Sequence, residues 1–321
     1  MQIALIGAGY WGKNILRNLK ELGFLSKVFE TSLSRVVELK KEYPDVDFAS
    51  SIEEIKQNPD INGVCIATPA VTHYTLVKEF LLSGKDVFVE KPLALKVSEA
   101  EELVKLAESS GRILMVGHIL RYHPAIIKLK ELIDSGELGD ICYIYSNRLN
   151  IGKLRTEENI LWSFAPHDIS VILYLIDMEP REVIAYGGAY IQKGVLDVTL
   201  THLTFPNDIK GHIFVSWLHP FKEQKLVVVG TKNMAVFDDT SKEKLALYPH
   251  KIKWIDGTIP VAEKAERVPL EVESKEPLKE ELKHFVECIK ERKTPWTDGR
   301  EGLRVLKVLE RAQESLNKRG N

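Results

Sequence analysis

Three glycines near the amino terminus have the spacing that a dinucleotide-binding turn needs. Gly7, Gly9 and Gly12 follow a short, mainly apolar run at residues 1–6, and a pattern with helical spacing begins directly after them. In such a turn the first glycine permits a tight bend, the second lets the backbone approach a pyrophosphate, and the third lets the helix pack against the strand. Free N–H groups at the start of the helix then attract phosphate. The alternative is an ordinary glycine turn between packed elements, which the flanking strand and helix make the weaker interpretation.

An acidic residue stands where the ribose of the dinucleotide is expected. Glu30 ends the second apolar run, at residues 25–29, and lies 18 residues after Gly12. A carboxylate there accepts hydrogen bonds from ribose hydroxyls and repels a 2′-phosphate, so it favours NAD over NADP. Arg35 keeps NADP open, because an arginine can hold a phosphate or stack on adenine. The ordinary alternative for Glu30 is a solvated charge at the end of a strand.

A lysine follows the fifth apolar run of the chain. The run at residues 87–89 leads into Glu90, Lys91 and Pro92. The carboxyl end of a parallel strand is where open α/β sheets bind ligands, and Pro92 restricts Lys91 to an extended backbone. A lysine partly withdrawn from water beside a cofactor can move a proton or hydrogen-bond a substrate hydroxyl. We therefore predict Lys91 as a catalytic and substrate-binding residue, although a lysine at a strand-end turn is otherwise an ordinary surface residue.

A histidine at residues 165–168 is the second candidate for proton transfer. His167 is followed by Asp168 and by an apolar helical run at 169–173. A histidine near a helix start and beside an acidic residue can act as a general acid or base near neutral pH. Each of the nine histidines, taken alone, is more often a packing or surface residue.

Polar residues crowd the segment upstream of His167. They are Arg155, Glu157, Glu158, Asn159, Trp162 and Ser163. Arg155 and Asn159 are candidates for holding a sugar or its carboxylate, because arginine binds carboxylates and phosphates through two hydrogen bonds. The alternative is a helix with one polar face.

The elements that must position these residues alternate between strands and helices in the first third of the chain. Strands are predicted at residues 1–6, 25–29, 47–49, 62–67, 87–89 and 113–117. Apolar strands separated by helices are typical of a parallel sheet that is covered on both faces. We predict a doubly wound, dinucleotide-binding Rossmann domain over residues 1–120.

The pattern changes after about residue 140. Consecutive strands with short turns are predicted at residues 141–150, 183–191, 196–205, 209–218, 225–229 and 235–238. A helix at about 160–176 interrupts them, and two helices close the chain. The fold class is therefore α/β: a Rossmann domain followed, over residues 121–321, by an α+β domain with a large, mainly antiparallel sheet for substrate binding and oligomerisation. The active site is expected between the two domains.

Composition limits the class of partner. The 321 residues include 44% hydrophobic and 28% charged residues, with a formal net charge of -2. This balance gives no support for binding nucleic acid or a membrane, and no apolar run is long enough to span a bilayer. Because the chain opens on a core strand, we expect no signal peptide, and the three distant cysteines show no metal or disulfide spacing. A cytoplasmic protein without a metal is expected. An exposed face of the antiparallel sheet, with Trp217 and Tyr145 among its apolar contacts, favours a homo-oligomer, a dimer or tetramer.

The motifs together resemble the Gfo/Idh/MocA oxidoreductase family over the whole chain. The resemblance is carried by the glycine turn with Tyr10 and Trp11, by residues 90–92, by residues 117–124 and by the His167 segment. Residues 143–150, Arg155 and residues 158–168 are similar to the branch that oxidises the 3-hydroxyl of UDP-N-acetyl-2-amino-2-deoxyglucuronate (UDP-GlcNAcA) in bacterial surface-polysaccharide synthesis. The resemblance implies NAD as cofactor, a UDP-sugar as substrate, and 2-oxoglutarate as the compound that reoxidises bound NADH.

The resemblance also implies a set of site residues. The family lysine corresponds to Lys91 and the active-site histidine to His167. Cofactor contacts are implied or predicted at Gly7, Ala8, Gly9, Tyr10, Trp11, Gly12, Glu30, Arg35, Thr68, Pro69, His73, Glu90, Lys91 and Trp162. Substrate contacts are predicted at Lys91, Arg155, Asn159, Ser163 and His167. Many members have an aspartate where this chain has Ser163, so a Lys–Asp–His trio is not expected, and either Lys91 or His167 is the base.

Two other functions remain open at this point. One is an NAD-dependent dehydrogenase of a free sugar or inositol on the same fold. The other is a non-catalytic sensor of NAD or a sugar nucleotide, because a fold does not dictate a function. The presence of both Lys91 and His167 argues against a sensor.

Overall fold

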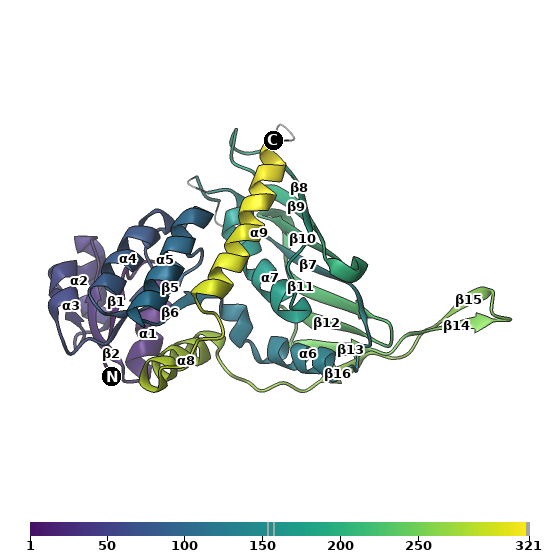
Figure 1. Cartoon of the computed structure of the whole chain (residues 1–321), viewed down its shortest axis with the longest axis horizontal. Helices are drawn as coiled ribbons and strands as arrows, with labels where there is room; N and C mark the ends of the chain where they lie inside the picture. Colours follow the sequence, from purple (N-terminus) through teal and green to yellow (C-terminus); the bar gives the residue numbers. More distant parts are fainter. Residues whose placement is uncertain (153, 157, 319–321) are drawn as a thin grey trace. The chain divides into compact units, whose positions relative to one another are not determined.

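The computed structural model describes residues 1–152, 154–156 and 158–318, and these form two compact units (Figure 1). The first unit comprises Met1–Tyr122 and Lys275–Leu306, and the second comprises His123–Ser274 and Lys307–Asn321. Residues 275–306 thus belong to the first unit, although they lie near the end of the sequence. The predicted division into domains 1–120 and 121–321 does not include this return. Helix α9 (Gly299–Lys318) begins in the first unit and ends in the second.

The first unit is built on a six-stranded sheet in which all strands are parallel. Its order is β3-β2-β1-β4-β5-β6. The strands are β1 (Ile3–Ile6), β2 (Leu25–Phe29), β3 (Asp47–Phe48), β4 (Gly63–Ile66), β5 (Asp86–Glu90) and β6 (Leu114–Gly117). β1, β4 and β6 are buried at every residue, because helices cover both faces of such a sheet. The predicted doubly wound fold is confirmed.

Helices connect the strands of the first unit. They are α1 (Gly12–Glu21), α2 (Leu33–Glu42), α3 (Ile52–Gln57), α4 (His73–Leu82) and α5 (Val97–Ser110), with the 3-10 turns η1 (Ala70–Thr72) and η2 (Ile119–Tyr122). The side chains of Ser32 and Ser51 cap α2 and α3 by accepting hydrogen bonds from the first helical turn. Gly111 ends α5 in the left-handed conformation.

Helix α8 (Pro277–Glu291) completes the core of this unit from the far end of the sequence. Its buried face, which includes Leu278, Leu282 and Phe285, packs in one cluster with side chains of β1, β4 and β5. The rings of Phe88 in β5 and Phe285 in α8 lie 5.9 Å apart. The helix α8, from the last part of the sequence, therefore completes the hydrophobic core of a sheet that is built from the first part.

The second unit is built on an eight-stranded sheet with helices on one face. Its order is β16-β13-β12-β11-β7-β10-β9-β8, and only the β7–β10 pair is parallel. The strands are β7 (Ile141–Ile151), β8 (Glu182–Gly188), β9 (Val198–Thr204), β10 (Lys210–Ser216), β11 (Leu218–Gly230), β12 (Met234–Asp238), β13 (Leu245–Tyr248) and β16 (Val268–Leu270). A 3-10 turn, η3 (Pro206–Asp208), joins β9 to β10. The predicted large, mainly antiparallel sheet is confirmed.

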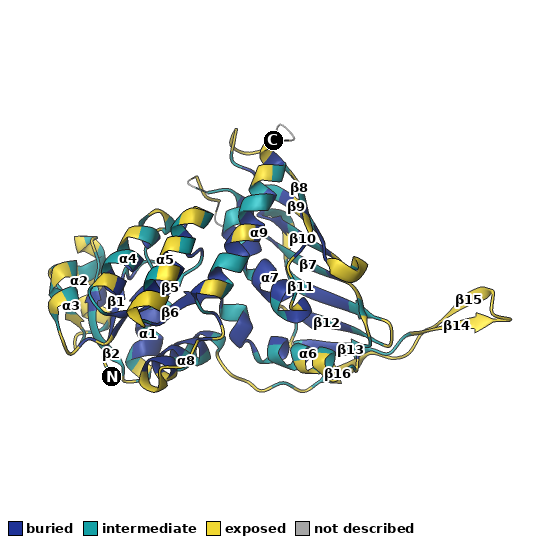
Figure 2. Ribbon diagram, in the orientation of Figure 1, coloured by how far each residue is buried: buried dark blue, intermediate teal, exposed yellow. Residues whose placement is uncertain are grey.

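Three helices contact this sheet. They are α6 (Pro124–Asp134), α7 (Ile160–Ile176) and the end of α9. Ser315 of α9 accepts a hydrogen bond from the N–H of Ala185 in β8, at 2.9 Å. Strand residues that face these helices are buried, and their neighbours on the other face are partly exposed, as Figure 2 shows. The sheet therefore has a covered face and an open face.

A hairpin leaves the edge of the second unit. β14 (Lys251–Ile255) and β15 (Ile259–Glu263) pair only with each other, and they extend away from the larger sheet (Figure 1). The sequence patterns did not predict these strands, because they contribute no residue to a core.

Trp217 was predicted to be an exposed apolar contact of the sheet, and this prediction is wrong. The side chain is 1% exposed, and its indole N–H donates a hydrogen bond to Asp197 at 2.6 Å. An indole can be buried here because its polar edge finds a partner. Tyr145, in contrast, lies on the open face and stacks on His212, with ring centroids 5.0 Å apart.

No helix in the described ranges is both long and apolar enough to cross a membrane. Within the same ranges, no cluster of three or more histidine, cysteine, aspartate or glutamate side chains could hold a metal ion.

Candidate active site

The glycine turn has the geometry that its spacing predicts. Gly7 has a φ of +86°, and a Cβ built on it would lie 2.8 Å from Cγ2 of Thr68. A Cβ on Gly12 would lie 2.2 Å from the carbonyl oxygen of Gly7, so only glycine lets α1 start this close to β1. A Cβ on Gly9 meets nothing within 4 Å. The first and third glycines are thus required by packing, and the second leaves open backbone that a pyrophosphate can approach.

Glu30 is held against this turn. Its carboxylate accepts hydrogen bonds from the N–H groups of Ala8 and Ser32, both at 2.9 Å. Arg35 follows in the first turn of α2, where its N–H donates to the Ser32 hydroxyl. The acidic group therefore lies beside the glycine turn, at the end of the neighbouring strand. This is the arrangement that fits an adenosine ribose, and with the open surface at Gly9 it makes the turn suitable for NAD.

The loop after β4 carries the next predicted cofactor residues. The hydroxyls of Thr68 and Thr72 lie 2.7 Å apart, and Pro69 precedes η1. His73 is only 1% exposed, and its ring nitrogens lie 2.7 Å from the carbonyl oxygen of Pro92 and 2.9 Å from that of Thr68. Burial lowers the pKa of His73. The family resemblance predicts a cofactor contact for His73, and in the structure both ring nitrogens link the loops that follow β4 and β5.

Lys91 leaves the carboxyl end of β5 directly after Glu90. The indole N–H of Trp11, from the glycine turn, donates a hydrogen bond to the carboxylate of Glu90. Burial raises the pKa of Glu90 to about 7, against the opposing effects of this hydrogen bond and of the charge on Lys91. The Lys91–Pro92 peptide bond is cis. Tyr10, beside Trp11, is 87% exposed. The structure therefore brings the glycine turn, Glu90 and Lys91 to one edge of the sheet.

His118 belongs to the same edge and was not predicted as a site residue. Gly117 is paired with Glu90 across β5 and β6, and His118 follows it. Its side chain is 2% exposed, and neither ring nitrogen has a hydrogen-bond partner among the described residues. Burial lowers the pKa of His118 to about 3, and the charges on Arg121 and Lys91 act in the same direction. The ring is therefore neutral at physiological pH. Its position after the sixth predicted strand was the signal that could have identified it.

The predicted residues of the second unit lie on or before α7. Ser163 and His167 are four residues apart, so they share one face of this helix. His167 was placed near a helix start, but α7 begins at Ile160 and His167 lies about two turns inside it. Pro166 is within the helix rather than at its head.

Asp168, the neighbour of His167, bonds to the sheet of the second unit. Its buried carboxylate accepts hydrogen bonds from Arg148, at 2.8 and 3.2 Å, and from the hydroxyl of Ser146, both residues of β7. The pair anchors α7 to the sheet. The carboxylate that adjacency in sequence offered to His167 is thus bonded to residues of β7.

The remaining substrate candidates differ in how their side chains are used. Arg155 is exposed and forms an ion pair with Glu158 at 3.1 Å. Asn159 is the N-cap of α7. Its side-chain oxygen Oδ1 accepts a hydrogen bond from the backbone N–H of Trp162, and its side-chain nitrogen Nδ2 donates one to Gln313. Asn159 thus has a structural role that the sequence argument did not foresee.

Trp162, predicted as a cofactor contact, donates its indole N–H to Gln313 at 3.0 Å. Glu157, part of the predicted polar segment, lies outside the described residues.

Comparison with known families matches both units. The model described as "Oxidoreductase family, NAD-binding Rossmann fold" (GFO_IDH_MocA) matches residues 1–118, and the model of the GFO/IDH/MocA C-terminal domain matches residues 126–236.

Curated relatives extend over nearly the whole chain at low identity. The scyllo-inositol 2-dehydrogenase (NAD(+)) of Bacillus subtilis is 25% identical, over 92% of this chain and 88% of its own length. The UDP-N-acetylglucosamine 3-dehydrogenase of Acidithiobacillus ferrooxidans is 24% identical, over 95% of this chain and 94% of its own length. A solved structure of the latter protein superposes with a TM-score of 0.87 at 23% identity, covering 99% of this chain and 98% of that one. At this identity the structural likeness shows the fold alone.

Proposed function

Because the chain belongs to the Gfo/Idh/MocA oxidoreductase family, whose first domain is an NAD-binding Rossmann domain, we propose that it oxidises the 3-hydroxyl of UDP-GlcNAcA to the 3-keto sugar. The observation that carries the oxidoreductase assignment is the edge of the first sheet, where the glycine turn, Glu90 and Lys91 come together. In this proposal the reaction supplies a precursor for bacterial surface polysaccharide in the cytoplasm.

The chemistry divides between the cofactor and the chain. NAD, when bound, accepts the hydride from the sugar carbon. The residues of the chain must remove the hydroxyl proton and hold the developing negative charge on oxygen. Lys91 suits this task because β5 and Pro92 fix its backbone at the ligand edge of the sheet. His167 is the alternative base, and the group that does not take the proton orients the hydroxyl.

The nucleotide-sugar substrate rests on two supporting points. A UDP-sugar 3-dehydrogenase is among the relatives that match almost the whole chain. Arg155 is an exposed cation ahead of α7, suited to a phosphate or to the carboxylate of the sugar acid. A free inositol is the second candidate, because scyllo-inositol 2-dehydrogenase matches at a similar identity.

The test is a substrate panel with NADH absorbance as readout. Purified protein is given NAD with UDP-GlcNAcA, UDP-N-acetylglucosamine, scyllo-inositol or myo-inositol. We expect the highest kcat/KM with UDP-GlcNAcA. Preference for a free inositol would overturn the substrate assignment, and no turnover of any of them would favour a sensor. A parallel assay contains 2-oxoglutarate, the proposed reoxidant of bound NADH, and measures its reduction to 2-hydroxyglutarate.

Lys91→Met separates catalysis from cofactor binding. Methionine has a similar length but carries no ammonium group, so it removes proton transfer and charge stabilisation at this point. We expect kcat to fall by about 10²–10⁴-fold, with NAD affinity, measured by calorimetry, near that of the wild type. Unchanged turnover would exclude Lys91 from the chemistry.

A further inference from the structure

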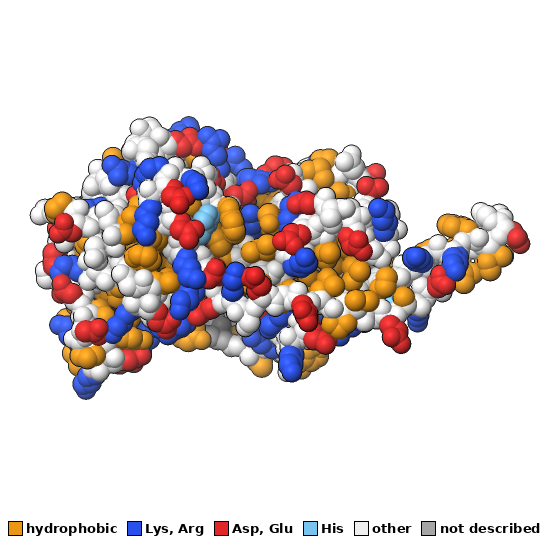
Figure 3. All heavy atoms as spheres, turned by 90° about the horizontal axis from the view of Figure 1, so that it is seen from below, with side chains coloured by type: hydrophobic (Ala, Val, Ile, Leu, Met, Phe, Trp, Pro, Cys, Tyr) orange, Lys and Arg blue, Asp and Glu red, His pale blue; other side chains and the backbone are white. Residues whose placement is uncertain are grey.

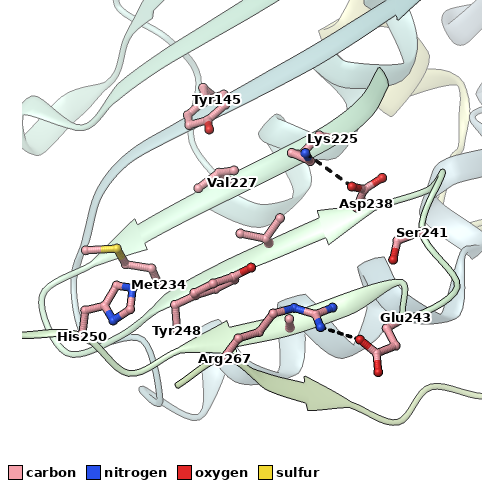
Figure 4. Close-up of a pocket in the computed structure, with 12 residues that line it drawn as sticks. Tyr145, Lys225, Val227, Met234, Asp238, Ser241, Glu243, Tyr248, His250 and Arg267 are labelled. Carbon is pink, nitrogen blue, oxygen red and sulfur yellow. Dashed lines mark hydrogen bonds and ion pairs between the residues drawn. The ribbon is translucent and has the colours of Figure 1, made fainter. Parts of the chain in front are cut away.

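Glu90 differs from the paired acids of the surface in how its carboxylate is held. On the face drawn in Figure 3, acidic and basic side chains are interspersed. In the hollow on the open face of the second sheet, shown in Figure 4, the acids are paired with bases: Lys225–Asp238, at 3.4 Å, and Arg267–Glu243. Glu90 instead accepts a hydrogen bond from the neutral indole of Trp11. This donor fixes the position of the carboxylate without supplying a positive charge.

The strand order places Glu90 on the path of the redox half of a bound dinucleotide. Glu30, at the end of β2, marks the side of the glycine turn that fits the adenosine ribose. The sheet continues in the order β2-β1-β4-β5, so the other half of the dinucleotide extends from the turn over β4 towards β5. Trp11 belongs to the turn and contacts the Glu90 carboxylate. The nicotinamide half is therefore expected beside this carboxylate.

Protein encloses the Glu90 carboxylate on one side and leaves it accessible on the other. A Cβ built on Gly117 of β6 would lie 3.1 Å from both carboxylate oxygens, so the group packs closely against this strand. The side chain as a whole is partly exposed at the edge of the sheet, where it can exchange a proton with solvent. A positively charged ring placed beside it favours the carboxylate, and a neutral ring favours the uncharged acid.

A second acid lies behind Glu90, in α8. Successive turns of α8 follow β5 towards its carboxyl end, since Arg292 forms an ion pair with the first residue of β5, at 2.7 Å, and Phe285 contacts Phe88. Glu281 precedes Phe285 by one turn and so approaches Glu90. Burial and the charge on Glu90 both raise the pKa of Glu281. Glu281 therefore stays neutral, and Glu90 is the acid of this pair that titrates.

The other titratable groups around Glu90 and Lys91 come from β4, α4, η2 and the residue after β6. Burial keeps four of them neutral near pH 7, by raising the pKa of a thiol and a phenol and by lowering that of two imidazoles: Cys65, Tyr122, His73 and His118. Arg121 is a cation that pairs with Glu301 at 3.4 Å. The charge on Lys91 lowers the pKa of Glu90, but burial is the larger effect, and the pKa of Glu90 is about 7.

We propose that Glu90 matches its charge to the oxidation state of the cofactor: it is a carboxylate when NAD⁺ is bound, and it takes up a proton when NADH is bound. The carboxylate balances the positive ring of NAD⁺, and the uncharged acid accompanies the neutral ring of NADH, so neither state buries an unpaired charge. Oxidation of an alcohol by NAD⁺ gives the ketone, NADH and one proton, which is the number that Glu90 takes up. The proposal rests on the oxidoreductase function proposed above, and it applies to a nucleotide sugar and to a free inositol alike.

Calorimetric titration of the protein with NAD⁺ and with NADH counts the protons exchanged. The binding enthalpy is measured at pH 7 in buffers that differ in ionisation enthalpy, and its slope gives the number of protons taken up or released. Because the pKa of Glu90 is about 7, we expect release of up to about half a proton with NAD⁺ and uptake of up to about half a proton with NADH. Glu90→Gln should abolish this difference. A difference that is absent from the wild type, or that persists in Glu90→Gln, would overturn the proposal.

Glu281→Gln is the matched control, because it replaces a neutral acid with a neutral amide behind Glu90. We expect it to exchange protons as the wild type does. Trp11→Phe removes a hydrogen bond that lowers the pKa of Glu90, so it should keep the difference between the two cofactor forms and move its maximum to higher pH. Lys91→Met should act in the same direction. Loss of the difference at every pH in Lys91→Met or in Glu281→Gln would assign the proton to that residue and contradict the role of Glu90.

The dissociation constants give an independent readout. As the pH rises from 6 to 8, we expect the ratio of Kd for NAD⁺ to Kd for NADH to fall by up to about tenfold per pH unit, and to stay constant in Glu90→Gln. Neither experiment requires a sugar. Binding of both cofactor forms without this linkage would contradict the role of Glu90 alone, whereas linkage in a protein that oxidises no sugar would support that role and contradict the proposed function.

Discussion

Glu30 shows how a single carboxylate can both shape a loop and select a cofactor. It accepts hydrogen bonds from the backbone of Ala8 and Ser32, so its position relative to the glycine turn is fixed before any ligand binds. A carboxylate fixed in this way repels a 2′-phosphate. Selectivity between NAD and NADP is therefore expected to depend on this residue more than on Arg35.

Glu30→Ala should reduce the preference for NAD. Removing the charge abolishes the repulsion of a 2′-phosphate and leaves Arg35 free to attract it, so we expect the ratio of kcat/KM for NAD to that for NADP to fall about 10–100-fold, equivalent to about 1.4–2.7 kcal/mol. Steady-state kinetics with both cofactors measures the ratio. Glu42→Ala, at the exposed end of α2, is the control and should leave it unchanged. An unaltered ratio in the Glu30 variant would show that the selectivity lies elsewhere.

Glu90 should act as a titrating partner of Trp11. Because burial raises the pKa of Glu90 to about 7, the carboxylate loses its charge as the pH falls through neutrality. The hydrogen bond from the Trp11 indole N–H is stronger to the ionised form. We expect tryptophan fluorescence to change with a midpoint near pH 7, and Glu90→Gln and Trp11→Phe each to remove that transition. A transition that survives in both variants would assign it to another group.

Residues that follow predicted strands were the ones that sequence reasoning located best. Glu30 and Lys91 could be placed because the carboxyl ends of parallel strands share one edge of a sheet. His73 is a cofactor contact by the family resemblance and Asn159 a candidate substrate contact, whereas in the structure the first links two loops and the second caps α7 and bonds to α9. Such contacts join residues that are distant in sequence, as with Asn159 and Gln313, and no local pattern contains them.

At the scale of elements, α8 is the clearest case of a helix whose packing partner cannot be predicted from the order of the sequence. Its apolar spacing predicts a helix, but not that it covers the sheet of the first unit. The contact of Phe88 with Phe285 places Glu90, two residues further along β5, on the same side of the sheet as α8. Glu281 lies one turn before Phe285, is 0% exposed, and has no hydrogen-bond partner for either carboxylate oxygen among the described residues. Burial, with a contribution from the charge on Glu90, raises the pKa of Glu281 well above its ordinary value.

Glu281→Gln should stabilise the protein at high pH. In the folded chain the acid stays neutral, while in the unfolded chain it ionises above about pH 4.5, so ionisation favours unfolding increasingly as the pH rises. Glutamine does not ionise in either state. The advantage of the variant is therefore absent near pH 4 and grows by up to about 1.4 kcal/mol per pH unit above it. Urea denaturation at pH 5 and pH 8 measures the difference.

Glu280→Gln provides the matched control for this prediction. Glu280 is on the same helix, is only half-buried and pairs with Lys283 at 2.8 Å. Its substitution should give no gain in stability that grows with pH. If Glu281→Gln behaves like this control, Glu281 is ionised in the folded protein and has a partner that compensates its burial.

At the scale of the whole molecule, the two units divide the predicted site. The glycine turn, Glu30, Glu90 and Lys91 belong to the first unit, and Arg155, Ser163 and His167 belong to the second. The sequence indicated this division through the change from alternating helices and strands to consecutive strands. It did not indicate the return of residues 275–306 to the first unit, nor the projecting hairpin, because each depends on contacts beyond the local pattern.

This division predicts where NAD should slow hydrogen exchange. At a concentration of 100 times Kd, a ligand that binds only the folded state stabilises it by about 2.7 kcal/mol, which slows exchange through opening of its site about 100-fold. We expect the effect in the glycine turn, around Glu30 and after β5, and no effect in β13 and β16 at the far edge of the second sheet.

Trp162 is the one predicted cofactor contact in the second unit, so protection of the first turn of α7 decides whether it belongs to the cofactor site. NADP at the same concentration is the control and should protect less, because Glu30 opposes its 2′-phosphate. Protection spread evenly over both sheets, or absent from the glycine turn, would contradict the proposed mode of binding.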